Sequence, residues 1–258
     1  MPAAPACFTT ALSHFPRNGS ERVFLRIRSF CYPAAVVKNR DKKEYFFPVL
    51  AFLFFLLIFV PVIVGETFRL APELLDRAEA RYGKEARTLL VAWENLIVQH
   101  NSRSDREKIG LVNEFFNRME FVDDMTHWGV DDYWATPVEF LGTRGGDCED
   151  FSIAKYFTLK AMGLEEEKLN LTYVKALSYN VHHMVLTYYE NPGAEPLVLD
   201  NIVADIKPAS QRADLIPIYS FNGTGLWLAK QRGRGMMAGS SSRLQRWQDL
   251  VERMNADR

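Results

Sequence analysis

An uncharged, apolar run of 20 residues divides this chain into two unequal parts. From Tyr45 to Val64 the sequence reads YFFPVLAFLFFLLIFVPVIV, without one charged side chain. About 20 apolar residues are needed to cross the hydrocarbon core of a bilayer, so the run is long enough to span one. A buried core helix of this length would carry a polar stripe, and this run has none. We therefore expect a signal sequence or a membrane anchor at 45–64.

Charges flank this run unequally. Residues 1–44 carry 8 lysines and arginines against 3 acids, and four of these basic residues lie between Lys38 and Lys43. By the positive-inside rule, the basic side stays in the cytoplasm. The chain after Gly65 is therefore expected to be exported.

The sequence leaves open whether the run is cleaved. It is longer than the apolar core of an ordinary signal peptide, and no clean Ala-x-Ala cleavage site follows it, which favours an anchor. Alternatively, the start at residue 1 is mispredicted, because a translation start near Val36 or Val37 would leave an ordinary basic n-region. The extension at 1–44 is then either cytoplasmic or absent. The exported domain is expected at 66–258.

The exported part is mildly acidic. Residues after Val64 hold 23 basic and 29 acidic side chains, a net charge of −6, which argues against nucleic acid as a partner. With 48% hydrophobic residues, the chain has enough apolar material for a packed core and is not a disordered chain. It contains neither a Gly-rich phosphate loop nor the Cys/His spacing of a zinc site.

The hydrophobic period changes from helical to alternating at Gly163. Before it, apolar residues recur at helical spacing in segments that begin near Leu74, Leu89 and Ile109. A fourth helix fits Cys148–Met162, with Gly163 in the usual position after a helix end.

After Gly163, short segments rich in β-branched and aromatic residues predict strands. These segments are residues 171–177, 181–189, 196–199 and 215–221. Helices followed by strands indicate an α+β fold, in which N-terminal helices pack on an antiparallel sheet.

Three further segments complete the expected architecture. The stretch Asp123–Gly146 is rich in Asp, Gly and Trp and is expected to be a loop. Residues 231–242 are expected to be a mobile loop. The apolar stripe from Leu244 to Met254 predicts a final amphipathic helix.

Cys148 is the only cysteine after the apolar run, so that part of the chain cannot form an intramolecular disulfide. An isolated cysteine in an oxidising compartment is a liability unless its thiol is used. The alternative is an inert, buried cysteine that acts as a small apolar residue. Its position at a predicted helix start, after Gly145 and Gly146, favours a nucleophile, because the helix dipole stabilises a thiolate.

A cysteine nucleophile needs an imidazole base, and that base needs a carboxylate to orient it. The predicted strand 181–189 offers His182 and His183, whose side chains point to opposite faces. A four-residue hairpin loop at Glu190–Gly193 would place His183 directly opposite Asp200. A slip of one residue would select His182 instead, so spacing supports His183 without excluding His182.

These segments resemble the transglutaminase-like cysteine peptidases of bacteria. DCEDFSIAKYFTLKAMG, HHMVLTYY and LVLDN, in that order, are similar to the LapG group of periplasmic proteases. The resemblance covers most of residues 70–228 and implies a papain- or transglutaminase-like fold with the nucleophile at a helix N-terminus. It implies Cys148 as nucleophile, His183 as general base and acid, and Asp200 as the orienting residue. The family's histidine precedes Met-Val-Leu, which selects His183 over His182.

The acids around Cys148 pose a separate problem. Asp147, Glu149 and Asp150 can complement the positive end of a helix, which is the common role of acids there. Three carboxylates beside a thiolate also raise its pKa and oppose activation. A bound divalent cation would remove this conflict, and calcium suits an all-oxygen site. The resemblance implies Ca²⁺ at Asp147 and Glu149, with Asp150 as a further candidate ligand.

The resemblance also implies what the enzyme does. It implies a calcium-dependent periplasmic cysteine endopeptidase that cuts a large surface adhesin near its N-terminus and so releases cells from a biofilm. It further implies control by an inner-membrane, LapD-type receptor that senses cyclic di-GMP. Two alternatives stay open: a transglutaminase- or amidase-type acyl transferase, which would use the same triad, and an inactive binding module of the same fold.

Overall fold

The computed structural model of this chain describes residues 68–228 and 235–256. The expected extension at 1–44 and the expected signal or anchor at 45–64 lie outside the described residues. Within the described ranges, no helix combines the length and apolarity needed to cross a membrane.

Three helices open the described chain at the segments that the apolar spacing predicts. They are α2 (Pro72–Tyr82), α3 (Lys84–His100) and α4 (Asp105–Phe116). Gly83 separates α2 from α3 with a φ of 94°, a conformation that glycine adopts without strain. Ser104 begins α4 through a capping box, in which the Glu107 carboxylate accepts the Ser104 backbone N–H at 3.0 Å.

Helix α7 (Cys148–Ala161) is the central helix of the fold and ends one residue before the predicted Cys148–Met162. It is buried along most of its length, from Asp150 to Leu159. Gly163 follows with a φ of 85°, as expected of a residue that terminates a helix.

The prediction of a loop over Asp123–Gly146 is wrong for much of that stretch. It contains two short helices, α5 (Asp124–Trp128) and α6 (Pro137–Thr143). Its last two residues form β2 (Gly145–Gly146), which pairs in parallel with β1 (Glu120–Phe121). These elements are shorter than the window in which a hydrophobic period can be recognised, so local caps rather than apolar stripes define them.

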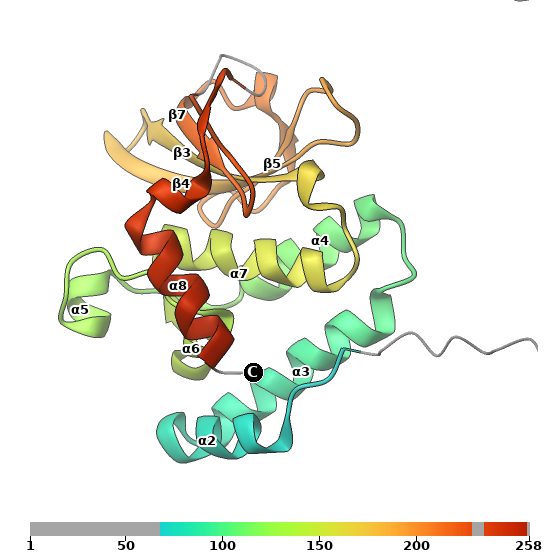
Figure 1. The fold of residues 1–258 in the computed structure, drawn as a ribbon, viewed down its shortest axis with the longest axis vertical. Coiled ribbons are helices and arrows are strands. Elements are labelled where there is room, and N and C mark those ends of the chain that lie inside the picture. The colour runs from blue at the N-terminus through green and yellow to red at the C-terminus, as the bar shows by residue number, and fades with distance from the viewer. Residues whose placement is uncertain (1–67, 229–234, 257–258) are drawn as a thin grey trace, which may run out of the picture. The chain divides into compact units, whose positions relative to one another are not determined.

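A seven-stranded sheet follows α7, and all its neighbouring strands are antiparallel. In spatial order the strands are β6 (Lys207–Pro208), β5 (Leu197–Leu199), β4 (Val181–Tyr188), β3 (Leu169–Ala176), β7 (Leu215–Phe221), β8 (Leu226–Leu228) and β9 (Met237–Gly239). The predicted α+β fold with an antiparallel sheet is confirmed. Figure 1 shows the sheet on one side of α7 and the helices α2 and α3 on the other.

The predicted register between β4 and β5 is wrong by two residues. Leu186 pairs with Leu199, so Asp200 lies diagonally across from His183 rather than directly opposite. The cause is the turn, which is closed by a hydrogen bond from Ala194 N–H to the Asn191 carbonyl at 3.0 Å, one residue later than predicted. Pro192 and Gly193 fill its two central positions, and Gly193 has a φ of 83°. A shift of two residues keeps the same face, so His183 and Asp200 still lie on one side of the sheet.

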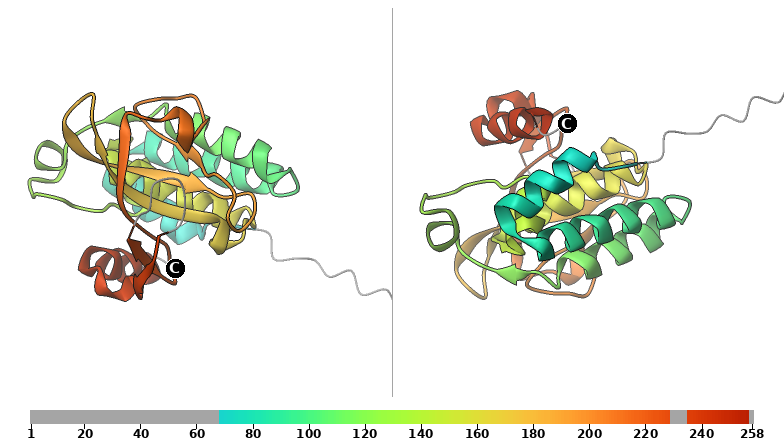
Figure 2. Two further views of the ribbon diagram at one scale, coloured as in Figure 1. Left: turned by 90° about the horizontal axis from the view of Figure 1, so that it is seen from above. Right: turned by 90° about the horizontal axis from the view of Figure 1, so that it is seen from below.

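Helix α8 (Gln245–Ala256) closes the chain, as the apolar stripe predicts. Its Trp247 stacks on Phe157 of α7 with ring centroids 5.5 Å apart. Figure 2 shows α8 along one side of the other elements, at their margin. The expected mobile loop at 231–242 is wrong for its second half, because β9 pairs with β8 and Ser241–Arg243 forms a 3₁₀ turn. Its first residues, 231–234, lie outside the described residues.

Candidate active site

Cys148 is the first residue of α7. Gly145 and Gly146, which precede Asp147, are required by close packing. A Cβ atom on Gly145 would lie 2.5 Å from the carbonyl oxygen of Glu120, and one on Gly146 would lie 2.2 Å from Asp150 Oδ2. No other residue type fits at these positions without displacing its neighbour. The glycine pair thus brings the β2 backbone against β1 and the first turn of α7.

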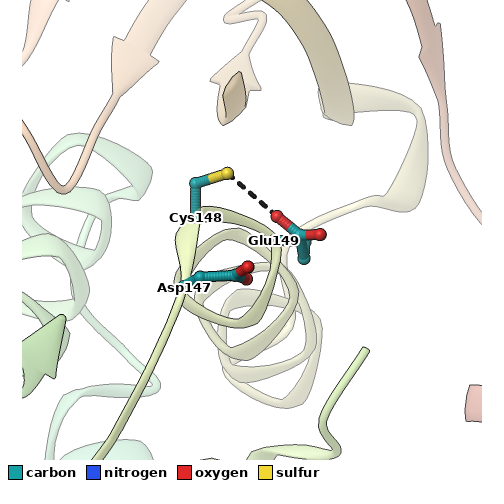
Figure 3. A group of neighbouring side chains, drawn as sticks. All are labelled: Asp147, Cys148 and Glu149. Atoms are coloured by element: carbon teal, nitrogen blue, oxygen red, sulfur yellow. Dashed lines mark hydrogen bonds between the residues drawn. The ribbon is translucent and has the colours of Figure 1, made fainter. Parts of the chain in front are cut away.

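The thiol of Cys148 is directed at the carboxylate of Glu149. Its Sγ donates to Glu149 Oε2 at 2.9 Å, as Figure 3 shows, with Asp147 on the other side of the cysteine in sequence. Burial, then the charge and hydrogen bond of Glu149, then the charge of Asp147 raise the pKa of the Cys148 thiol well above its usual range. Burial and the neighbouring acids therefore both favour the protonated thiol over the thiolate.

The backbone of Met184 joins the first turn of α7 to strand β4. Ser152, one helical turn after Cys148, donates to the Met184 carbonyl oxygen at 3.0 Å. The Met184 backbone N–H interacts with Cys148 and lowers the thiol pKa in part. Because Met184 follows His183 directly, these contacts set Cys148 beside the segment that carries the predicted base.

His183 and Asp200 form a buried pair. His183 Nε2 lies 2.8 Å from Asp200 Oδ1, and the two residues are 3% and 1% exposed. Burial alone would raise the pKa of Asp200, but hydrogen bonds from His183, from the Ile202 backbone N–H and from Arg212 lower it to about 2. Asp200 is thus ionised at neutral pH. The Asp200 carboxylate is bonded to Nε2 of His183, so Nδ1 is the other ring nitrogen, which this bond leaves free.

His182, the other candidate base, lies elsewhere. Its side chain is exposed and its ring stacks on Tyr173 at 5.2 Å, with 8° between the planes. Strand alternation sends it to the opposite face from His183. Among the described residues, no carboxylate is hydrogen-bonded to His182, so the geometry favours His183.

Arg212 and Asn117 hold Asp200, and sequence reasoning missed both. Arg212 donates to Asp200 Oδ2 at 2.8 Å, and Asn117, just after α4, donates to the Asp200 carbonyl oxygen at 2.8 Å. Arg212 stands in no periodic segment or motif, and Asn117 is a polar position near the end of the helical segment that begins near Ile109. A lone arginine or asparagine between elements carries no pattern that would set it apart from a surface residue.

Two further acids, Asp124 and Asp132, reach the carboxylates beside Cys148. Oxygens of Asp124, Asp132 and Glu149 lie within 4.8 Å of one another, as do those of Asp124, Asp147 and Asp150. The sequence shows Asp124 and Asp132 only as members of an acidic loop, which is why they were not predicted. We call these five residues the acid cluster: Asp147, Glu149 and Asp150 from the start of α7, and Asp124 and Asp132 from α5 and the residues after it.

This acid cluster has the donor set of a hard cation site. Asp124 Oδ1 and Asp147 Oδ1 are buried and have no hydrogen-bond partner. Burial, then the charges of Glu149 and Asp150, raise the pKa of Asp147 to about 10, and burial raises that of Asp124 to about 6. Unpartnered, crowded carboxylate oxygens fit a calcium ion, which takes six to eight oxygen ligands.

Asp150 differs from the other acids. Its Oδ1 accepts the Ala135 backbone N–H at 2.7 Å, and its Oδ2 accepts the Asp147 backbone N–H at 3.3 Å. The side chain thus ties the residues before α6 to the start of α7. This supporting role competes with its predicted role as a ligand, whereas Asp147 Oδ1 has no hydrogen-bond partner.

Comparisons with known proteins identify the family to which this chain is similar. The family model for the bacterial transglutaminase-like cysteine proteinase BTLCP matches residues 91–229. The structure of EGTA-treated LapG from Legionella pneumophila is 42% identical, covering 73% of this chain and 99% of that chain, with a TM-score of 0.64. The calcium-bound LapG structure from the same organism is 43% identical over 70% of this chain and 98% of that chain, with a TM-score of 0.61. No protein among those with curated descriptions matches.

Proposed function

Because this chain belongs to the bacterial transglutaminase-like cysteine proteinases, we propose that Cys148, His183 and Asp200 form the catalytic triad of a calcium-dependent endopeptidase. The observation that carries the proposal is the buried hydrogen bond between His183 Nε2 and Asp200 Oδ1. It lies next to Met184, whose backbone contacts the first turn of α7. A histidine that acts as a general base needs a fixed carboxylate to orient its ring, whereas a histidine without a catalytic role has no need of one.

The proposed reaction begins when Nδ1 of His183 takes the thiol proton and Cys148 Sγ attacks the carbonyl carbon of the scissile peptide bond. The tetrahedral intermediate collapses to a thioester as the imidazolium returns its proton to the leaving amine. Water, deprotonated by His183, then attacks the thioester, which gives a carboxylate product and restores the thiol. Asp200 holds the imidazole in position and stabilises its charged form throughout.

The negative oxygen of the intermediate needs hydrogen-bond donors. The first N–H groups of a helix have no partner within the helix, so the backbone N–H of Cys148 at the start of α7 is one such donor. The same positive helix end favours the thiolate once the neighbouring carboxylates are neutralised.

Calcium belongs to this proposal through the acid cluster. Asp147, Glu149 and Asp124 would hold the ion, and Asp132 and Asp150 have carboxylate oxygens within 4.8 Å of others in the cluster. A bound cation supplies positive charge that offsets the carboxylates beside the thiol. If Glu149 were a calcium ligand, its Oε2 would no longer be free to hold the Cys148 thiol, with which it is now hydrogen-bonded at 2.9 Å. The LapG structures support this assignment, since one of them is described as calcium-bound.

The cellular role is proposed from the family likeness. We place the domain in the periplasm, exported by residues 45–64, where it cleaves a large surface adhesin near its N-terminus and releases cells from a biofilm. An inner-membrane receptor of the LapD type that senses cyclic di-GMP would control access to the substrate. The 42% identity to LapG over 73% of the chain supports this role.

The test is cleavage of an N-terminal adhesin fragment by the purified protein, with and without calcium. Mass spectrometry of the products should find one new amino terminus and one new carboxylate. Incorporation of an added amine in place of the free carboxylate would instead identify an acyl transferase. Binding of the fragment without either reaction would identify a binding module.

A further inference from the structure

Arg212 contacts the oxygen of Asp200 that His183 does not use. Oδ1 of Asp200 accepts from His183 at 2.8 Å and from the Ile202 backbone N–H at 2.9 Å, whereas Oδ2 accepts from Arg212 at 2.8 Å. Both oxygens of this buried carboxylate are therefore hydrogen-bonded, Oδ1 twice and Oδ2 once. The side chain of Asp200 cannot rotate about its Cβ–Cγ bond without breaking one of these bonds.

The guanidinium of Arg212 is itself hydrogen-bonded to a second carboxylate, that of Asp214. Arg212 is 5% exposed, and Asp214 accepts from its Nε at 3.0 Å and from its terminal NH2 nitrogen at 2.8 Å. This two-point contact fixes the plane of the guanidinium, as a single point charge would not. The backbone that carries them is hydrogen-bonded as well, because Leu177 N–H donates to the Asp214 carbonyl at 2.8 Å and Leu215 N–H donates to the Arg212 carbonyl at 3.1 Å.

Arg212 is the permanent cation near Asp200. Lys155 of α7 also lies close enough to act on Asp200, but burial lowers its pKa to about 7, so at neutral pH it is only partly charged. Arginine stays charged at every accessible pH. The charges facing the buried pair are thus Arg212, Lys155 and, behind Arg212, the carboxylate of Asp214.

We propose that Arg212 is a positioning residue of the active site, which orients Asp200 toward His183 and offsets part of the Asp200 charge. The inference rests on the proposed role of His183 as base. A buried ion pair contributes little net stability, so stability alone does not account for an arginine here. Removing its charge leaves only the partly charged Lys155 to oppose the Asp200 carboxylate, and the pKa of His183 should then rise.

Two substitutions separate charge from hydrogen bonding. Arg212→Gln keeps an N–H donor but removes the charge, and Arg212→Lys keeps the charge but loses the two-point contact with Asp214. Arg106→Gln is the matched control, because it breaks an exposed ion pair with Glu190 at 2.6 Å. The His183 pKa is read by NMR titration of the purified protein, with the signal assigned by its loss in His183→Ala. The kcat and KM values are measured on a cleavable adhesin fragment.

For Arg212→Gln we expect the His183 pKa to rise by about 1 pH unit. We also expect kcat to fall about 10- to 100-fold, with KM nearly unchanged, because the base is misaligned while the binding surface is intact. Arg212→Lys should keep the His183 pKa near the wild-type value and recover part of kcat. Arg106→Gln should change none of these quantities.

An unchanged His183 pKa and kcat in folded Arg212→Gln would overturn the proposal, as would a lower melting temperature alone. If Arg212→Gln fails to fold, Asp214→Asn replaces it, and an unchanged kcat there has the same meaning. Full activity in His183→Ala would instead remove the proposed base, whatever Arg212 does. The failure of the proposed function and the failure of this inference are therefore distinguishable.

Discussion

Ser152 on α7 donates a hydrogen bond to the carbonyl oxygen of Met184 on β4 at 3.0 Å. Ser152 is one helical turn beyond Cys148, and Met184 is one residue beyond His183. Both partners are buried, so this bond fixes the position of the first turns of α7 along strand β4. This contact thus helps to set the position of the candidate nucleophile, Cys148, relative to the candidate base, His183.

We expect Ser152→Ala to impair both folding and catalysis. It leaves the buried Met184 carbonyl without a partner, which costs about 1–3 kcal/mol. Chemical denaturation should show that loss. In the folded fraction kcat should fall more than KM rises. Equal kcat in the folded variant would mean that other contacts alone set the position of α7 against β4.

Cys148→Ala should leave a folded domain without proteolytic activity. The side chain is small and half-buried, so the loss of stability should be about 1 kcal/mol or less. No other cysteine follows Val64, so no substitute nucleophile exists and kcat should drop by about a million-fold. Circular dichroism checks the fold and fragment cleavage checks the activity. Residual cleavage by the pure variant would contradict a covalent mechanism.

Exchanging the two neighbouring histidines for alanine should give opposite results. His183→Ala should abolish turnover, because it removes the ring that Asp200 orients. His182→Ala should only weaken activity, since it removes an exposed ring whose stacking on Tyr173 contributes about 0.5–1.5 kcal/mol at most. Each variant is the control for the other. Loss of activity in His182→Ala alone would show that His182, on the opposite face of the strand, is the base.

Chelation should stop cleavage, and added calcium should restore it. Magnesium should restore it poorly, because it demands tighter octahedral geometry and sheds water reluctantly. Asp147→Asn and Glu149→Gln should each weaken calcium binding at least about tenfold in calorimetry and lower activity in parallel. Glu114→Gln, which breaks an exposed ion pair with Arg118, is the control.

Acids that only complement the helix start would behave differently. They contribute about 0.3–1 kcal/mol of stability each, and their loss would leave catalysis nearly intact. Full activity in chelator, together with no heat of calcium binding, would rule out the cation site.

The stability of the calcium-free protein should fall as the pH rises from 6 toward 9. The pKa of Asp147, raised to about 10, lies far above the usual range of an aspartate, so the folded state keeps a proton that the unfolded chain releases. Stability therefore falls with pH, by up to about 1.4 kcal/mol per pH unit for one such group. Calcium should remove this slope by taking the proton's place. Urea denaturation at several pH values checks both arms, and a flat profile in chelator would contradict the account.

Much of the fold follows from apolar spacing. Long amphipathic helices such as α3, and the central strands β3 and β4, bury one stripe or face over many residues, and that period is visible in the sequence. The short elements are not visible, because a helix such as α6 is defined by the Thr136 capping box rather than by a stripe. The register between β4 and β5 is set by a single turn, and the Pro192-Gly193 pair forms the centre of that turn.

The site was only partly predictable for a related reason. Cys148, His183 and Asp200 stand in motifs, and a two-residue register error kept His183 and Asp200 on one face. Asp124 and Arg212 come from segments without a period, and only the folded chain brings them to the site. Long-range contacts of this kind leave no spacing to recognise in one sequence.

Labelling with a thiol-reactive peptide probe tests the central claim most directly. The purified protein is treated with the probe in calcium or in chelator, and mass spectrometry locates the modified residue. We predict modification of Cys148 in calcium, little modification in chelator, and little in His183→Ala under either condition. Equal labelling of Cys148 in wild-type protein and in His183→Ala, independent of calcium, would contradict the proposed activation of Cys148 by His183 and a bound cation.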